Sequence, residues 1–99
     1  MSGCLFHRYR AHVLEALRTV VPGIGDDILA RVELTPTRDP SHGDMATNAA
    51  LVSSKEARRK PADIAAELVS ILQNVEGVAS AASAGPGFVN ITLSADTLR

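Results

Sequence analysis

Residues that interrupt helices and strands divide this sequence into short pieces, and this spacing limits its fold more than any other feature. The interruptions are Pro22-Gly23, the turn-rich stretch 36–43, Pro61, Gly77 and the run Gly85-Pro86-Gly87. Proline and glycine at such positions end helices and form tight turns. The segments between these interruptions are short, so each is expected to hold short helices or strands only. The chain is therefore expected to fold as one domain of short elements in the order α-β-α-α-β-β.

Helical spacing of apolar residues marks three segments. The first segment runs over residues 5–21. The third segment starts at Pro61, because proline suits the first position of a helix, and it ends at Gly77. The second is expected to begin at Asp44, whose carboxylate would cap the first turn, and to end at Lys60. The apolar stripes that support these three helices contain Phe6, Val13, Leu17 and Val20, then Met45, Ala49 and Val52, then Ile64, Leu68, Ile71 and Leu72.

Alternation marks the strands. Residues 28–35 alternate around Val32 and Leu34, with room for a helical turn before them, and residues 78–84 and 88–94 flank the Gly85–Gly87 turn as a hairpin. The expected fold is α+β, a small, mostly antiparallel sheet packed with about three helices. Residues 1–94 would form this domain, and residues 95–99 would begin a helix that connects to something else.

Composition excludes several classes of protein. Ten Lys and Arg against eleven Asp and Glu give a net charge of −1, so any contact with an anionic partner must be local. A single cysteine, Cys4, and the histidines His7, His12 and His42 show no metal-ligand spacing and no nucleophile–base arrangement. The sequence has neither a membrane-spanning run nor a secretory leader, so we expect a cytoplasmic chain with no membrane partner, no metal and no catalytic residues of its own.

The run Lys55, Arg58, Arg59 and Lys60 closes the second helix. Cations at a helix C-terminus are favoured by the helix dipole whatever the protein does. The same side chains could instead contact phosphates, and both interpretations stay open at this point. Arg8, Arg10 and Arg18 in the first helix carry the same ambiguity.

Phe88 and Asn90 are expected to share one face of the last strand, opposite Val89 and Ile91, because side chains alternate along a strand. A ring can stack on a nucleic-acid base, and an adjacent amide can hydrogen-bond to a base edge. The alternative is structural: a helix covers Phe88, and Asn90 completes a turn.

Two glycine-containing stretches are assigned structural roles. His42, Gly43, Asp44 and Asn48 would form a loop and helix cap, with Asn48 reaching back into the 36–43 loop. Gly85 and Gly87 lie in a turn between two strands, whereas a phosphate-binding P-loop needs a helix after its glycines.

The chain resembles the amino-terminal domain of bacterial arginyl-tRNA synthetases over nearly its whole length. The resemblance is carried, in order, by Pro40, His42, Gly43, Asp44, Thr47, Asn48 and Ala50, by Lys55, Lys60, Pro61, Ile64 and Ala65, and by Ala84-Gly85-Pro86-Gly87-Phe88-Val89-Asn90-Ile91 with Leu93. The family implies binding to the outer corner of tRNA, where the aromatic and amide of a Gly-Phe-x-Asn segment contact a D-loop base. In this sequence those residues are Phe88 and Asn90.

The resemblance also implies what the chain lacks. The family's catalytic domain carries His-x-Gly-His and Lys-Met-Ser-Lys-like motifs, and neither occurs in these 99 residues. We therefore expect an RNA-binding piece of a larger arginine–tRNA ligase, joined to a catalytic domain that uses ATP and magnesium. A module that docks on a protein partner is the alternative.

Overall fold

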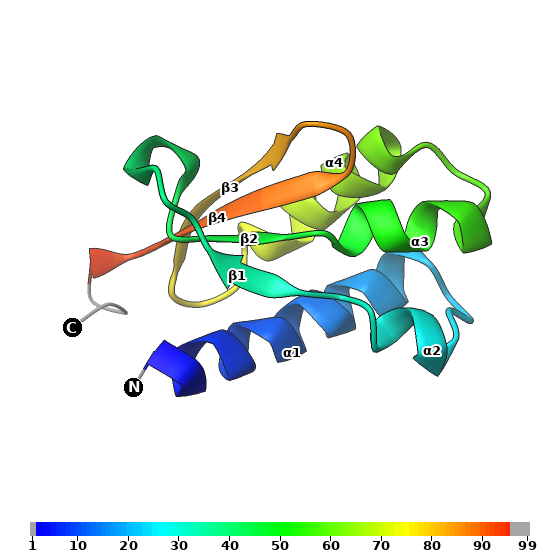
Figure 1. Cartoon of the computed structure of the whole chain (residues 1–99), viewed down its shortest axis with the longest axis horizontal. Helices are drawn as coiled ribbons and strands as arrows, with labels where there is room; N and C mark the ends of the chain where they lie inside the picture. Colours follow the sequence, from blue (N-terminus) through cyan, green and yellow to red (C-terminus); the bar gives the residue numbers. More distant parts are fainter. Residues whose placement is uncertain (1, 96–99) are drawn as a thin grey trace.

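The computed structural model describes residues 2–95, with the side chains of residues 2–4 and 40 left out (Figure 1). Its elements, in chain order, are α1 (Ser2–Val20), α2 (Asp26–Leu29), β1 (Leu34–Pro36), a short 3-10 helix η1 (Pro40–His42), β2 (Met45–Thr47), α3 (Ala49–Ala57), α4 (Pro61–Leu72), β3 (Val78–Ala84) and β4 (Phe88–Leu93). This architecture confirms the expected α+β class. The expected connecting helix at 95–99 lies, from residue 96 on, outside the described residues.

The four strands form one antiparallel sheet in the order β1-β2-β4-β3. Helix α4 packs against β3 and β4, and α1 packs against α4 and β1, so these helices cover one face of the sheet (Figure 1). We call the opposite face the open face. No helix in residues 2–95 is long and apolar enough to cross a membrane.

The core lies between the sheet and the helices. Strand β4 supplies Val89, Ile91 and Leu93, which are buried, as the period of two predicts. Opposite them lie the apolar stripes of α1 and α4. Of the predicted members, Val13, Leu17, Ile64, Leu68 and Leu72 are buried, whereas Phe6, Val20 and Ile71 are partly buried and pack against the core. Tyr9, Ala16 and Ala65 are buried with them.

The second helix does not begin at Asp44, and that prediction is wrong. Residues Met45–Thr47 form β2, and α3 begins only at Ala49. Met45 and Thr47 are buried, and they pair with Ile91 and Val89 of β4. The carboxylate of Asp44 accepts the backbone N–H of Leu93 (2.7 Å) rather than capping a helix. Pairing with distant β4 thus overrides the helix that local spacing favours.

The expected strand 28–35 is shorter than predicted and shifted. Helix α2 ends at Leu29, and β1 spans only Leu34–Pro36. The guanidinium of Arg10 in α1 donates to the backbone oxygens of Val32 (3.1 Å) and Leu29 (3.2 Å). These bonds hold the connection between α2 and β1 against α1, so Arg10 has a structural role.

Candidate nucleic-acid interface

Asn90 stands in the middle of the open face with small neighbours. Strand pairing places Ala46 of β2 on one side of it and Ala82 of β3 on the other. Neither methyl group can hydrogen-bond to the amide, and within the described residues the Asn90 side chain makes no hydrogen bond. It therefore does not complete a turn. The amide is left with its full capacity to donate and accept.

Phe88 begins β4 on the same open face. Its side chain is 38% exposed, and its partner across the β3–β4 pair is the small Ala84. The alternative in which a helix buries this ring does not hold. Among the side chains that the structure describes, the exposed large hydrophobic ones are Phe88 and Leu51, the latter at 42%. An exposed aromatic ring in a chain with 3% aromatic residues is a candidate contact for a planar partner.

The turn before Phe88 is fastened to the two neighbouring helices. The backbone oxygen of Gly87 accepts the N–H of Leu51 in α3 (3.0 Å). A Cβ atom on Gly87 would lie 2.9 Å from the Leu51 Cα atom and 2.9 Å from the Pro61 Cβ atom. Glycine is therefore required here for close approach as well as for its φ of 107°. The contact fixes the start of β4 relative to α3 and α4.

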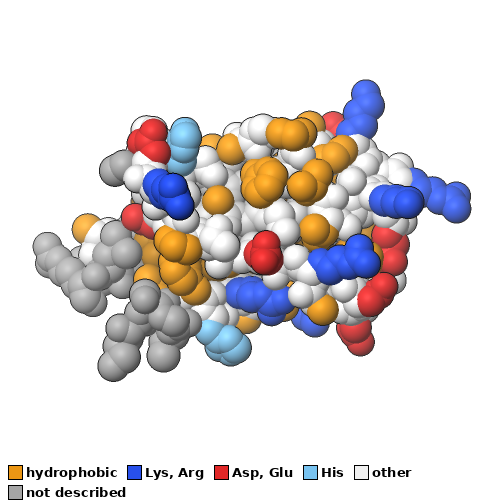
Figure 2. All heavy atoms as spheres, in the orientation of Figure 1, with side chains coloured by type: hydrophobic (Ala, Val, Ile, Leu, Met, Phe, Trp, Pro, Cys, Tyr) orange, Lys and Arg blue, Asp and Glu red, His pale blue; other side chains and the backbone are white. Residues whose placement is uncertain are grey.

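A cluster of cations lies where α3 ends and α4 begins. Lys55, Arg58 and Lys60 are exposed, and Figure 2 shows Lys and Arg side chains gathered at this end of the molecule. Arg58 closes α3 in the left-handed conformation, with its N–H bonded to the Lys55 oxygen (3.3 Å). Arg59 differs because it forms a salt bridge with Glu67 of α4. Three of the four predicted cations are thus left exposed; we call Lys55, Arg58 and Lys60 the basic corner.

The basic corner lies on the same side of α3 as Leu51. Lys55 follows Leu51 by four residues, which places the two side chains one above the other on a helix. Lys60 directly precedes Pro61, whose side chain lies against Gly87. Lys55 and Lys60 are therefore close in the chain to Leu51 and Pro61, the two residues that lie against Gly87.

The other predicted residues lie at the far end of β4. Gly43, with φ of 86°, brings the loop so close to β4 that a Cβ atom would lie 2.8 Å from the Ile91 oxygen. Asp44 binds Leu93 there, and His42 is exposed in η1. Five residues of strand, about 17 Å, separate Leu93 from Phe88. The structure therefore does not bring this loop together with Phe88.

Asn48 does not reach into the 36–43 loop, contrary to the prediction. Its side-chain oxygen accepts the N–H of Glu33 (2.7 Å), and its amide nitrogen donates to the oxygen of Arg31 (3.4 Å). Asn48 precedes α3 without a side-chain bond to that helix. It instead fixes the segment that leads into β1.

One charge in the 36–43 loop is perturbed. The backbone N–H of Ser41 donates to the Asp39 carboxylate (3.0 Å), and chiefly for this reason the pKa of Asp39 lies below its ordinary value. Asp39 is on the surface, so the bond organises the loop and forms no buried catalytic acid.

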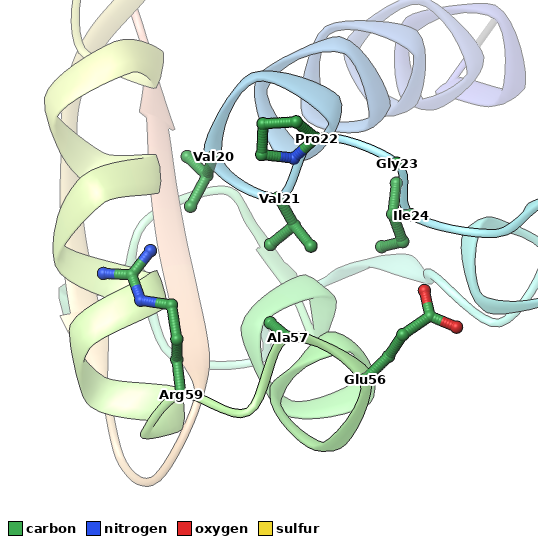
Figure 3. Close-up of a pocket in the computed structure, with 8 residues that line it drawn as sticks. All are labelled: Val20, Val21, Pro22, Gly23, Ile24, Glu56, Ala57 and Arg59. Carbon is green, nitrogen blue, oxygen red and sulfur yellow. The ribbon is translucent and has the colours of Figure 1, made fainter.

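A hollow of about 300 Å³ opens between the end of α1 and the end of α3 (Figure 3). Valine, proline and isoleucine side chains form its floor, and Glu56 and Arg59 border it. Both charged groups already have partners, because Glu56 accepts the Gly25 N–H (2.9 Å) and Arg59 pairs with Glu67. In the described part of the chain, no group of three or more His, Cys, Asp or Glu could hold a metal ion.

Leu51 is the residue of this surface that sequence reasoning missed. The predicted apolar stripe of the second helix contains Ala49 and Val52, and Leu51 lies outside it. A usable signal was present: a large apolar residue four positions before Lys55, on the charged side of the helix.

Comparisons with known proteins identify a family. Residues 7–93 match the family model described as "Arginyl tRNA synthetase N terminal domain". An arginine–tRNA ligase of Gluconobacter oxydans (strain 621H) is 62% identical over 98 residues, which are 99% of this chain and 16% of that protein. One of Nitrobacter winogradskyi is 52% identical over 75 residues, 72% of this chain and 13% of that protein. The chain thus spans a small part of the relatives it matches.

The fold also occurs in a solved structure. The crystal structure of arginyl-tRNA synthetase from Plasmodium falciparum matches with a TM-score of 0.75 and 21% identity, over 94% of this chain and 16% of that one. This likeness shows that the four-stranded sheet and its helices form a recurring fold.

Proposed function

Because the chain belongs to the arginyl-tRNA synthetase N-terminal domain family, we propose that it binds tRNA for an arginine–tRNA ligase and contacts the D-loop corner with its open face. Phe88 stacks on an unpaired base of that loop, and Asn90 hydrogen-bonds to a base edge. A single observation carries this proposal: an exposed ring and an unbonded amide lie on one strand face.

The surroundings of the pair suit RNA. Alanines beside Asn90 leave room for a base to approach the amide. Single-stranded loops are recognised by stacking on aromatic rings together with hydrogen bonds to exposed base edges. The basic corner then lies within reach of the flanking phosphates. With a net charge of −1, the chain has few other attractions for RNA, so binding by the isolated chain is weak.

The chemistry of ligation belongs to a different part of the proposed ligase. We assign ATP, magnesium and arginine to an attached catalytic domain, because this chain matches only 16% of the length of an arginine–tRNA ligase. This chain supplies recognition and positioning of the RNA. Protein synthesis places the proposed ligase in the cytoplasm.

A binding titration with arginine-accepting tRNA tests the proposal. Phe88→Ala removes a stacked base, worth about 1–3 kcal/mol, and raises Kd by roughly 5- to 150-fold. Asn90→Ala raises Kd less, by about fivefold, and blunts discrimination at one D-loop position. Ser70→Ala, at an exposed position of α4, the helix that covers the other face of the sheet, is the control and leaves Kd unchanged.

Thermal unfolding of each variant, measured together with its Kd, shows whether a change in Kd comes from lost contact or from loss of the fold. Phe88 is exposed enough that its truncation leaves the domain folded. A folded Phe88→Ala chain with wild-type affinity for tRNA refutes the proposed role. In that case the exposed ring serves a protein partner.

A further inference from the structure

The two exposed large hydrophobic side chains come from different elements whose backbones adjoin each other. Leu51 belongs to α3 and Phe88 to β4. The bond from the Leu51 N–H to the Gly87 oxygen (3.0 Å) joins them one residue away from Phe88. Figure 2 shows hydrophobic side chains gathered over the start of β4 and the adjoining part of α3. We call Leu51 and Phe88 the apolar corner.

The backbone beneath the apolar corner is closely packed. A Cβ atom at Gly87 would lie only 3.0 Å from the Leu51 Cβ atom, so α3 and the turn already touch without any space between them. Pro61 closes the other side of Gly87. This packing fixes the backbone positions of Leu51 and Phe88 before a ligand binds, which reduces the entropic cost of binding.

We propose that Leu51 is a second nucleotide-contacting residue, which packs against the edge of the same unpaired base that stacks on Phe88. This inference rests on the proposed function and adds to it a side wall of the base site. Phe88 alone would accept any base in any rotation about the stack. A side wall formed by Leu51 would restrict that rotation and turn the edge of the base toward Asn90.

The charges around the apolar corner favour a nucleotide over an apolar protein segment. Lys55 lies one helical turn beyond Leu51, and Lys60 adjoins Pro61. Both cations are exposed. An apolar partner surface would gain nothing from two flanking cations, whereas a nucleotide presents a phosphate on each side of its base. An RNA loop therefore fits both the corner and its border.

A double-mutant cycle on tRNA binding tests the inference. Leu51→Ala raises Kd about three- to tenfold, because part of its apolar contact with the base is lost. Leu51→Met keeps the volume and stays within about twofold of wild type. Gln73→Ala, at the far end of α4, trims another exposed side chain as a control and leaves Kd unchanged.

The coupling between the two residues decides whether they hold one base. In Leu51→Ala/Phe88→Ala the loss is smaller than the product of the single losses, because without the stacked ring the base no longer reaches Leu51. The inference is overturned if the rise in Kd of the double variant equals the product of the two single rises. It is also overturned if a folded Leu51→Ala chain has an unchanged Kd. If Phe88→Ala also leaves Kd unchanged, the proposed function itself fails, so the two failures are distinguishable.

Discussion

Replacing Gly87 with alanine tests how the start of β4 is held against the helices. Gly87 has a φ of 107°, and its missing Cβ leaves room for the Leu51 Cα and Pro61 Cβ atoms, each 2.9 Å from where a Cβ would lie. Gly85, in the same turn, offers a matched control. It has a φ of 57°, and a Cβ there would meet nothing within 4 Å.

The two substitutions therefore separate backbone strain from crowding. Gly85→Ala places a side chain in the left-handed region at a cost of about 1–2 kcal/mol. Gly87→Ala adopts a φ that is less favourable still, at about 1–3 kcal/mol, and must also push apart two packed helices, at about 1–3 kcal/mol more. Alanine reduces the entropy of the unfolded chain equally in both variants, so this effect cancels in the comparison.

Thermal and denaturant unfolding measure the difference. We expect Gly87→Ala to melt at least about 4 °C below Gly85→Ala, because each kcal/mol shifts the Tm of a domain this size by about 4–8 °C. Gly87→Ala should also weaken tRNA binding, since it displaces Phe88 relative to Leu51. Equal Tm values for the two variants would refute the close approach on which the apolar corner depends.

Asp44→Ala leaves the Leu93 N–H without its acceptor and should lower the free energy of unfolding by about 1–3 kcal/mol; a loss below about 0.5 kcal/mol would contradict the observed bond. The Asp39 carboxyl, followed by NMR, should titrate below the usual value of about 3.9. Because its folded pKa is the lower one, its stabilising contribution is complete above the unfolded pKa and is lost as the pH falls through the folded pKa; a titration at or above the usual value would contradict the Ser41 bond. Binding of tRNA should fall with salt at a slope of log K against log[salt] of roughly −2 to −4, as about two to four phosphate contacts imply, and a slope steeper than about −6 would reveal a basic surface beyond the basic corner.

Local sequence patterns were sufficient to predict the elements whose partners are close in sequence. The stripes of α1 and α4 lie on the core as predicted, and the β3–β4 hairpin forms around Gly85 and Gly87. The placement of Phe88 and Asn90 on the face opposite Val89 also follows from alternation alone. Such elements depend on spacing within a few residues, which a sequence displays directly.

Elements that depend on distant partners were missed. A strand of three residues, Met45–Thr47, has too little alternation to be told from the start of a helix, and it forms because β1 and β4 lie on either side of it. The same holds for the surface around Phe88. Leu51 and Gly87 are 36 positions apart, and no local pattern indicates that they touch. The sequence indicated Phe88 and Asn90 as candidate contacts, whereas Leu51 could be identified only from the fold.

The most direct measurement of the central claim is a titration of the isotopically labelled chain with arginine-accepting tRNA, followed through its backbone amide signals. We expect shifts at residues 88–92 on the open face, with smaller ones at Leu51 and the basic corner, and none at the hollow beside Gly23 and Ile24. Addition of tRNA that leaves residues 88–92 unshifted, or that shifts only residues around the hollow, would contradict the claim that the open face binds RNA.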